Sequence, residues 1–487
     1  MKYPPRPSRR QLLGSLGIAA GAIAIGDVVL HGVEAHADNH ELGDQNLLVF
    51  ITFEGAWDTL LCLDPRDHTI YGSKASGTGI YTGLEEVRVF DPITSAMLDL
   101  TDGISEKGLY QAPGSNLAFG PAMVTDVTGS AVTSPFGDLY DDMCVIRGVD
   151  MGTLTHEVGR RYFMTGKFPR GVLPSGSALG TWIAAQTPDS ALIPNLVLGG
   201  CETINENLPP KASGLEIASI GDLQYVLKKV GATVVPDNIT QAIADAQASD
   251  SCVHKQLSPG GMIEAYRAGW TKAGELVDGD LFSDFNFVAQ PTGDIAALYQ
   301  AFGINPNNPT ADLNGPKGRC ATAAQAIVKG LSRAVSLRIN PQSMDTHLDN
   351  WQTSHVQRMR PCFEAVASLI KFLKSQSFWD RTTLVISSEF ARTPKLNNQN
   401  GRDHHLCNSI VLAGNGIKGN QVIGASGPDS YDVVPFDFDA QVPDAKMSTP
   451  IRPADVHATI CKAMDISYEH IENQEPKLLT EVLSETS

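Results

Sequence analysis

The stretch Asn46-Leu-Leu-Val-Phe-Ile-Thr-Phe53 is a continuous apolar run, typical of a strand buried on both faces of a sheet. It leads directly into Glu54-Gly-Ala-Trp-Asp58, so Asp58 is expected just beyond the carboxyl end of this strand. In open α/β sheets, ligands bind at that edge. Further short apolar runs that predict buried strands lie at 143–149, 194–199, 383–387 and 409–413.

Helical patterns alternate with these strands. Helices are predicted over 157–165, 321–336 and 354–376, and from Pro453 onward. Gly166 suits the left-handed conformation that ends many helices. The segment 205–330 consists of helical patterns separated by Pro, Gly and Asp loops, and it predicts a helical insertion. The alternation predicts an α/β fold with a mainly parallel sheet sandwiched by helices.

The first 37 residues have the order of an export signal. A basic start that includes Arg9 and Arg10 precedes an apolar segment over 12–30, and Ala35-His-Ala37 supplies a cleavage site. The Arg9-Arg10 pair predicts the twin-arginine route, which carries folded cargo. A membrane anchor is the alternative, but several Gly residues and Asp27 make the segment a poor spanning helix. We therefore expect a mature domain of residues 38–487, periplasmic or extracellular, with no stable membrane span.

The composition excludes some partners and sites. Without the first 37 residues, the chain has 33 Lys and Arg against 52 Asp and Glu. A nucleic-acid partner is not expected, because nucleic acids bind to basic surfaces. The eight cysteines form no Cys-x-x-Cys pair, which excludes a structural zinc ribbon. We expect one or two disulfides at most, since several cysteines lie in apolar segments.

Carboxylate and histidine residues gather where strands are expected to end. Asp345 and His347 flank one residue, so in an extended segment both side chains point to one side. Ligands collected from separate strand ends are typical of a divalent-metal site, whereas a single such residue is usually an ordinary hydrogen-bonding group of a loop. Several such strand ends in one chain favour the metal site. The candidate metal ligands are Asp58, Asp345, His347, Glu389, Asp403, His404 and His405.

The turn before the helix at 157–165 is a second candidate site. Thr155 stands where free backbone N–H groups at a helix start favour an anion. Its hydroxyl could attack phosphorus or sulfur if a metal lowered its pKa, and Arg160 could hold the substrate oxygens. Alternatively, Thr155 is only a helix cap and Arg160 lies on a solvated face.

These residues lie in sequence blocks that resemble a known family. The blocks are Thr155-His-Glu-Val-Gly-Arg-Arg-Tyr-Phe-Met-Thr-Gly166, Met344-Asp-Thr-His347, Ser387-Ser-Glu-Phe-Ala-Arg-Thr393, Gly401-Arg-Asp-His-His405 and Gly414-Asn-Gly-Ile-Lys-Gly419. Through them, nearly the whole mature chain resembles the exported bacterial family of domain of unknown function 1501. That family is related to the alkaline phosphatase and sulfatase superfamily, which implies an alkaline-phosphatase-like core.

The resemblance also implies roles for individual residues. In the superfamily, two divalent metals bridge a Ser, Thr or Cys nucleophile at a helix start. By resemblance, the metal ligands would be Asp58, Asp345, His347, Glu389 and either His404 or His405. Two positions depart from the pattern: Phe390 stands where a paired histidine is expected, and His156 falls on the position of the nucleophile, one residue after Thr155.

The sequence thus predicts an exported, metal-dependent hydrolase that acts on a phosphate or sulfate ester. The attacking group would be Thr155 or a metal-activated water, and the substrate would be an anionic small-molecule or glycan ester. The ion would be manganese, iron, calcium or zinc. The alternative is a binding protein on the same scaffold, with a degraded site that recognises an anionic glycan or a protein partner. The oligomeric state does not follow from the sequence.

Overall fold

The computed structural model describes residues 44–74, 78–84, 88–91, 96–99, 108–123, 134–187, 191–227, 245 and 281–485 of the 487-residue chain. The signal peptide predicted at residues 1–37 lies outside these ranges. In the described part of the chain, no helix is both long and apolar enough to cross a membrane.

An eight-stranded sheet forms the centre of the unit made by residues 41–220 and 288–487. Its strand order is β14 (Gln421–Gly424), β6 (Met143–Asp150), β13 (Cys407–Gly414), β10 (Thr382–Ser388), β1 (Leu47–Phe53), β9 (Ala334–Arg338), β7 (Asn195–Leu198) and β8 (Leu215–Ile217). Every neighbouring pair is parallel except the two pairs that involve β13. The predicted class, a mainly parallel α/β fold, is confirmed.

Strand β1 lies between β10 and β9, and all seven of its residues are buried. Because side chains alternate across a strand, its two sides pack against different helices. On one side the Phe50 ring lies 5.7 Å from that of Phe163 in α3 (His156–Thr165). On the other, the Phe53 ring lies 5.0 Å from that of Phe363 in α12 (Val356–Ser375). The predicted burial of this strand on both faces is therefore confirmed.

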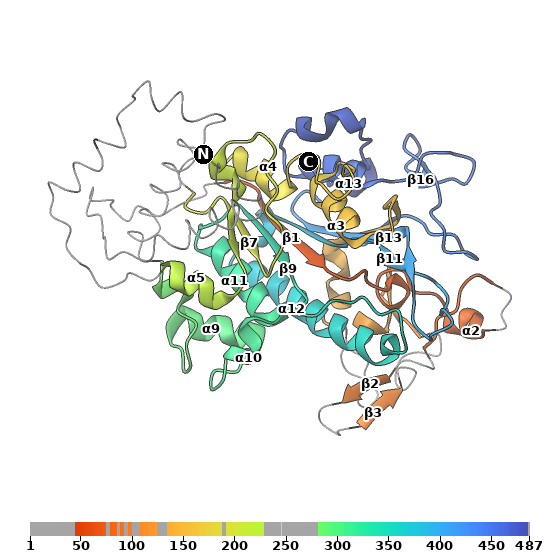
Figure 1. Cartoon of the computed structure of the whole chain (residues 1–487), viewed down its shortest axis with the longest axis horizontal. Helices are drawn as coiled ribbons and strands as arrows, with labels where there is room; N and C mark the ends of the chain where they lie inside the picture. Colours follow the sequence, from red (N-terminus) through yellow and green to blue (C-terminus); the bar gives the residue numbers. More distant parts are fainter. Residues whose placement is uncertain are drawn as a thin grey trace, which may run out of the picture. The chain divides into compact units, whose positions relative to one another are not determined.

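Helices cover both faces of the sheet. Figure 1 shows α3, α4 (Leu179–Ala185) and α13 (Pro453–Ala463) on one side, and α11 (Pro316–Val328) and α12 on the other. Helix α3 ends at Gly166 with a positive φ of 69°, as its sequence predicts. A helix was predicted over 321–336, and the predicted end is wrong: α11 stops at Val328, and β9 starts at Ala334. The apolar residues from 334 are strand residues, and a short apolar run does not distinguish the two states.

The segment 205–330 contains more than helices. Strand β8 belongs to the main sheet, and the described helices are α5 (Ile220–Leu227), α9 (Gly293–Phe302), α10 (Thr310–Leu313) and α11. The described residues between 221 and 287 belong to a second compact unit. Residues 228–244 and 246–280 lie outside the described ranges, so a helical insertion there stays a prediction.

The remaining elements are short. They are the strands β2 (Arg88–Asp91), β3 (Ala96–Asp99), β4 (Tyr110–Gln111), β5 (Ala118–Phe119), β11 (Ala391–Arg392), β12 (His404–His405), β15 (Phe436–Asp437) and β16 (Val442–Pro443), the helix α2 (His68–Tyr71) and the π-helical turn η6 (Trp351–His355). The 3-10 turns are η1 (Thr59–Leu61), η2 (Pro121–Met123), η3 (Gly137–Asp142), η4 (Pro210–Ser213), η5 (Ser283–Phe285), η7 (Trp379–Arg381), η8 (Glu469–Gln474) and η9 (Thr480–Val482).

The seven cysteines in the described ranges are all buried, and none is in a disulfide. They are Cys62, Cys144, Cys201, Cys320, Cys362, Cys407 and Cys461. Burial raises the pKa of each of these thiols above its ordinary value. They therefore pack as small apolar side chains.

Candidate metal centre

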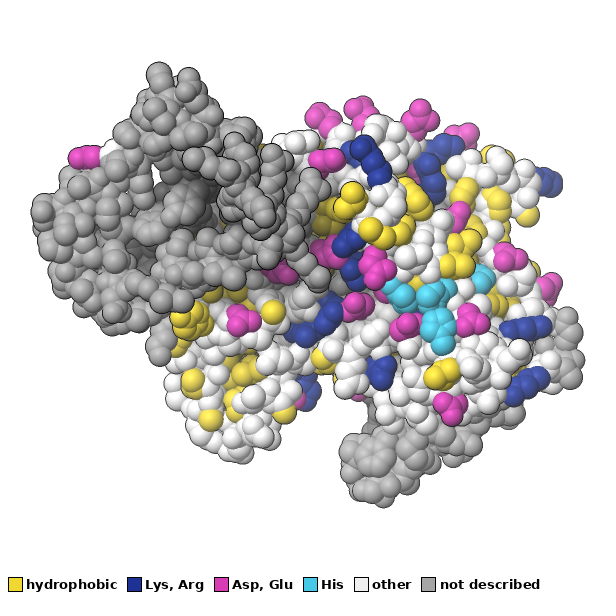
Figure 2. Space-filling model, viewed as in Figure 1, with side chains coloured by type: hydrophobic (Ala, Val, Ile, Leu, Met, Phe, Trp, Pro, Cys, Tyr) yellow, Lys and Arg dark blue, Asp and Glu magenta, His cyan; other side chains and the backbone are white. Residues whose placement is uncertain are grey.

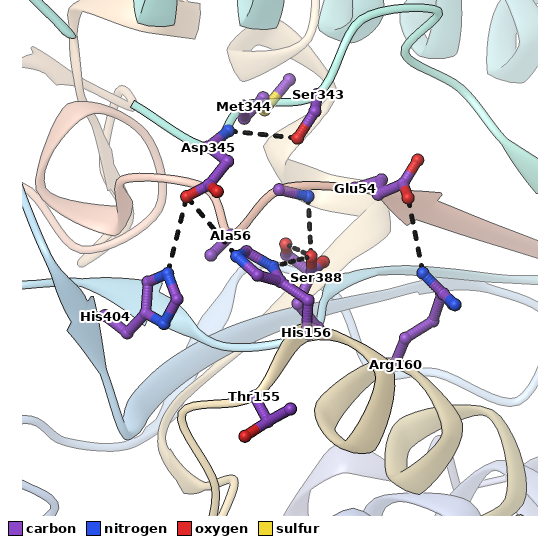
Figure 3. A network of polar contacts seen from close by, with 12 residues as sticks. Glu54, Ala56, Thr155, His156, Arg160, Ser343, Met344, Asp345, Ser388 and His404 are labelled. Carbon is purple, nitrogen blue, oxygen red and sulfur yellow. Dashed lines mark hydrogen bonds and ion pairs between the residues drawn. The ribbon is translucent and has the colours of Figure 1, made fainter. Parts of the chain in front are cut away.

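Four side chains converge at the carboxyl edge of the sheet. Asp345 Oδ1 lies 2.8 Å from His347 Nε2 and 3.4 Å from His156 Nε2. It also lies 3.5 Å from His404 Nε2, and the two Nε2 atoms of His347 and His404 are 2.9 Å apart. Figure 3 shows His156 and His404 directed toward Asp345. We call these four residues the histidine–aspartate cluster.

The members of the cluster come from separate strand ends. His156 is the first residue of α3, which follows β6, and Asp345 and His347 lie in the loop after β9. His404 belongs to β12, which pairs with β11 just beyond β10. Since β6, β9 and β10 run in the same direction, their carboxyl ends share one edge, where α/β sheets place their ligands.

Each of the three histidines has its other ring nitrogen engaged. His404 Nδ1 donates to the backbone carbonyl of Leu154 at 2.6 Å, and a carbonyl can only accept. His156 Nδ1 lies 2.7 Å from Glu389 Oε1, and His347 Nδ1 lies 2.8 Å from Asp403 Oδ1. These acceptors hold the Nδ1 atoms, so all three rings direct their Nε2 atoms at the cluster.

Four potential metal ligands lie close together in the cluster, beside the Arg392 guanidinium, whose Nη1 lies 3.3 Å from His347 Nε2. The His156 Nε2 atom is buried and makes no hydrogen bond to a described residue. Ligand atoms of His156, Asp345 and His404 all lie within 4.8 Å of one another. Ligands that share one ion at about 2.0–2.2 Å are themselves separated by roughly 3–3.5 Å. The residues present therefore fit a divalent metal ion, with the oriented Nδ1 partners that metal-binding histidines commonly have.

The charges of the surrounding carboxylates agree with these hydrogen bonds. Burial raises the pKa of Asp345, but contacts with His156, His404 and Arg392 outweigh it and hold that pKa well below its ordinary value. Burial also raises the pKa of Glu389, and His156 reverses the effect, so the net shift is downward. The hydrogen bond from His347 lowers the pKa of Asp403. All three groups are therefore ionised acceptors at neutral pH.

Glycine 159 permits the contact between α3 and β10 on which His156 depends. A Cβ atom at Gly159 would lie 2.4 Å from the backbone oxygen of Glu389. With only hydrogen there, the first turn of α3 lies directly on the end of β10. His156 can then reach Glu389, whose Oε1 also accepts from Gly55 N at 2.7 Å.

Arg392 belongs to the site, although it was not named as a candidate in the sequence analysis. Its side chain is fully buried, and Nη2 lies 2.6 Å from Asp345 Oδ1. Its Nε donates to the backbone oxygen of Ala56 at 2.9 Å, and Nη1 donates to that of Arg402 at 3.1 Å. Hydrogen bonds to backbone oxygens fix the guanidinium in place. The signal was present in the block Ser387–Thr393, which continues directly from Glu389.

The structure places the seven predicted ligands in different environments. The structure brings Asp345, His347 and His404 together in the cluster, while Glu389 and Asp403 lie behind histidines as hydrogen-bond partners. Of the two adjacent histidines, His404 lies in the cluster, and strand alternation directs His405 to the other side. His405 points away from His404 and lies with its ring 6.0 Å from that of Tyr431.

Asp58 has a different environment from the one predicted. Its carboxylate is fully buried, with Oδ2 3.2 Å from Arg402 Nε and 2.9 Å from Trp351 Nε1. Oδ1 accepts from the backbone N–H of Leu60 at 3.1 Å. Burial raises the pKa of Asp58, against the opposing effect of Arg402. Four residues separate Asp58 from the strand end, and the turn between them directs its side chain to the Arg402 guanidinium.

The predicted catalytic residues also differ from expectation. Thr155 precedes α3 without a side-chain capping bond, and in Figure 3 its hydroxyl lies on the side away from Asp345 and His404. Arg160 pairs with Glu202 at 2.6 Å and with Glu54 at 3.4 Å. His156, which occupies the predicted nucleophile position, joins the cluster. Phe390 is buried, with its ring 4.9 Å from His156 and 4.5 Å from His404.

The cluster is accessible from solvent. Figure 2 shows a compact group of histidine side chains on the visible face, with acidic side chains beside it. The side chain of Asp345 is 39% exposed and that of His347 is 36% exposed. A small solute can therefore reach the cluster from the surface.

Fold and site together define a mainly parallel α/β protein with a histidine–aspartate cluster at the carboxyl edge of its sheet. Residues 45–478 match the family described as "Protein of unknown function (DUF1501)". The chain belongs to this family, as its sequence blocks indicated. A comparison with curated proteins found no match.

Three of the solved structures that match this chain at low sequence identity are a putative sulfatase, a sulfatase and an alkaline phosphatase. A putative sulfatase from Bacteroides fragilis is 12% identical, with 93% of this chain and 80% of that chain covered and a TM-score of 0.38. A sulfatase from Pseudoalteromonas sp. is 10% identical, with 95% and 72% covered and a TM-score of 0.34. The TAB5 alkaline phosphatase, in a mutant with Mg bound, is 13% identical, with 87% and 99% covered and a TM-score of 0.31.

Replacing Asp58 by Ala tests whether this carboxylate supports the fold or binds a metal. The change removes the charge partner of the buried Arg402 guanidinium, and unfolding free energy should fall by about 3–5 kcal/mol. Metal content per folded protein should not change. Urea unfolding and metal analysis measure the two effects.

The exposed Asp380 provides a matched control, because Asp380→Ala should alter stability by less than about 0.5 kcal/mol. A stable Asp58→Ala protein that has lost its metal would instead identify Asp58 as a ligand.

The metal-free protein should lose stability as the pH rises from about 6.5 to about 9. Burial lowers the pKa of His156, but Asp345 and Glu389 outweigh it and raise this pKa from 6.5 to about 9. A raised pKa in the folded state stabilises fully below 6.5, and the effect disappears as the pH passes the folded value. The stabilisation is on the order of 1–3 kcal/mol. Urea unfolding in the presence of a chelator measures it.

His156→Gln should lack this pH-dependent decrease, since glutamine does not titrate in this range. An equal decrease in both proteins would assign the pH dependence to another group.

Proposed function

We propose that this protein is a metal-dependent hydrolase of phosphate or sulfate esters, with His156, His347, His404 and Asp345 as the metal ligands. One observation carries the proposal: three imidazole Nε2 atoms converge on one carboxylate oxygen, and each ring has its Nδ1 held by an acceptor. This set of ligands includes His156, which the sequence had suggested as a catalytic group at the nucleophile position.

The ligand chemistry favours some of the four ions over others. Three imidazoles and one carboxylate suit zinc, iron and manganese. Calcium prefers six to eight oxygen ligands, and Asp345 is the one cluster residue that offers oxygen. Calcium is therefore the least suitable of the four ions.

A bound divalent ion would supply Lewis-acid polarisation of the ester and a lowered pKa of a water molecule. The residues of the chain would orient this centre. Glu389, Asp403 and the Leu154 carbonyl hold the Nδ1 protons of the three rings, so each Nε2 is available. Arg392 keeps Asp345 ionised and fixed, because its own guanidinium is held by backbone oxygens.

We assign the attack to water. The Thr155 hydroxyl lies on the side away from the cluster (Figure 3), which argues against Thr155 as the nucleophile. In the reaction, the water oxygen would bond to phosphorus or sulfur as the bond to the ester oxygen breaks. The departing alcohol would leave with one proton, and the product would be inorganic phosphate or sulfate. Arg160 is paired with Glu202 and Glu54, so we do not assign it to the substrate.

A non-catalytic binding protein is the second candidate. Phe390 fills the position of an expected second-metal histidine, and Arg160 is neutralised by two glutamates. Both features favour a site that holds an anionic glycan or a protein partner without cleaving it. The ester panel below distinguishes this candidate from the hydrolase.

We further propose export by the twin-arginine route, with removal of residues 1–37 before the protein works in the periplasm or outside the cell. The support is the order of basic, apolar and small residues in the sequence.

Replacing both Arg9 and Arg10 by Lys should leave uncleaved precursor inside the cell, because the route recognises the arginine pair. Cell fractionation with immunoblotting detects the precursor. Export of the double variant at the level of the unchanged chain would exclude this route.

The adjacent histidines allow a matched test of the metal centre. His404→Ala removes one Nε2 ligand, and metal affinity should fall by about 100-fold or more, since loss of an outer partner alone costs about 10–100-fold. His405→Ala alters the neighbouring residue on the opposite side of the strand and should keep its metal. Elemental analysis and zinc titration by calorimetry measure both proteins.

Activity is tested on the same pair with p-nitrophenyl phosphate and p-nitrophenyl sulfate. The His405→Ala protein should hydrolyse at least one ester, and His404→Ala should be inactive. Metal bound equally by both variants would contradict the assigned ligands. Stoichiometric metal without hydrolysis of a wide ester panel would favour the binding protein.

A further inference from the structure

Exposed apolar side chains lie next to the ligand residues of the cluster. Leu154 lies two residues before His156, and Leu348 directly follows His347. Their exposed fractions are 46% and 48%, although leucine is usually buried. Figure 2 shows apolar side chains near the group of histidines on the visible face. The large exposed apolar residues of these segments, of the bend after β12 and of the loop after α3 form what we call the apolar rim: Leu154, Phe168, Val172, Leu173, Leu348 and Leu406.

The backbone that carries two of these leucines is fixed against the cluster. The Leu154 carbonyl accepts from His404 Nδ1 at 2.6 Å, and the Leu406 carbonyl accepts from Met151 N at 3.2 Å. These bonds place the turn at 151–154 beside β12. Leu406 follows His404 by two residues, at the bend between β12 and β13.

Leu348 and Phe168 also lie on ordered backbone or pack against it. Leu348 forms a bridge with Asn400, in the loop whose Asn397 side chain donates to the His347 carbonyl at 2.9 Å. The Phe168 ring lies 5.1 Å from that of Tyr162 and covers Gly152, where a Cβ would be 3.4 Å away. Ordered backbone with exposed apolar side chains is ready to bury an apolar group at little conformational cost.

We propose that the apolar rim binds the alkyl or aryl group of the substrate, so the substrate class is an anionic ester with an apolar leaving group. The inference rests on the proposed function and adds the chemistry of the leaving group to it. The cluster would take the anionic phosphoryl or sulfuryl group, and the rim would cover the carbon chain attached to the ester oxygen. The substrate would therefore have one anionic end and one apolar end, and these match the cluster and the rim.

The rim gives a graded preference for chain length. Each methylene that becomes buried improves binding by roughly fourfold, and partial exposure reduces this factor. The metal-loaded protein should therefore hydrolyse octyl phosphate with a kcat/KM on the order of 10- to 100-fold above that for methyl phosphate. The same comparison applies to octyl and methyl sulfate.

The test compares the unchanged protein with Leu348→Ala/Leu406→Ala. Release of inorganic phosphate or sulfate gives kcat/KM for the methyl and octyl esters, and calorimetry gives their dissociation constants. The octyl-to-methyl ratio should fall about tenfold in the double variant. Val442→Ala, an exposed apolar residue of β16 outside the ligand-bearing segments, should leave the ratio unchanged.

The outcomes separate the two proposals. Hydrolysis with equal kcat/KM for methyl and octyl esters would overturn the rim and leave the hydrolase intact. Rim-dependent tight binding of octyl phosphate without any hydrolysis would overturn the hydrolase and support the rim. Binding to phosphatidylcholine vesicles that requires Leu348 and Leu406, with no preference among soluble esters, would reassign the rim to a lipid surface.

Discussion

The buried guanidinium of Arg392 holds together the loops on which the candidate site depends. Its donors reach backbone oxygens of Ala56 and Arg402 and the carboxylate of Asp345. These three partners follow different strands of the sheet, and they lie far apart in the sequence. A long, planar, permanently charged donor can join several loop carbonyls at once, which a lysine could not do with the same geometry. The position of Asp345, and with it the meeting point of the three histidines, follows from this anchor.

Sequence patterns predicted the strands of the scaffold well, but they predicted the directions of individual side chains less well. The apolar runs at 46–53, 383–387 and 409–413 became central strands, because burial on both faces leaves a strong composition signal. The spacing of Asp345 and His347 also predicted that both side chains point to one side, and the two groups lie 2.8 Å apart in the cluster. Sequence patterns could not place Asp58, because the turn after β1 determines where that side chain points, and no periodic pattern describes a turn.

His156 was given another role in the sequence analysis, and Arg392 was missed. His156 was considered as a catalytic group at a helix start, whereas Gly159 brings α3 so close to β10 that the ring becomes a partner of Glu389. Arg392 lies in a two-residue strand, which is too short to show any period. Both roles depend on close approach between elements far apart in sequence, and such approaches are fixed by packing.

The burial of the cysteines has a consequence for the dynamics of the fold. The thiols of Cys144, Cys320 and Cys461 lie in β6, α11 and α13, so they are distributed over the sheet and both helical layers. Thiolate is the reactive form, and burial raises the pKa of each of these groups. A thiol reagent can therefore modify each one only during transient openings of its surroundings. The labelling rate of each cysteine would report the local opening free energy of its own layer.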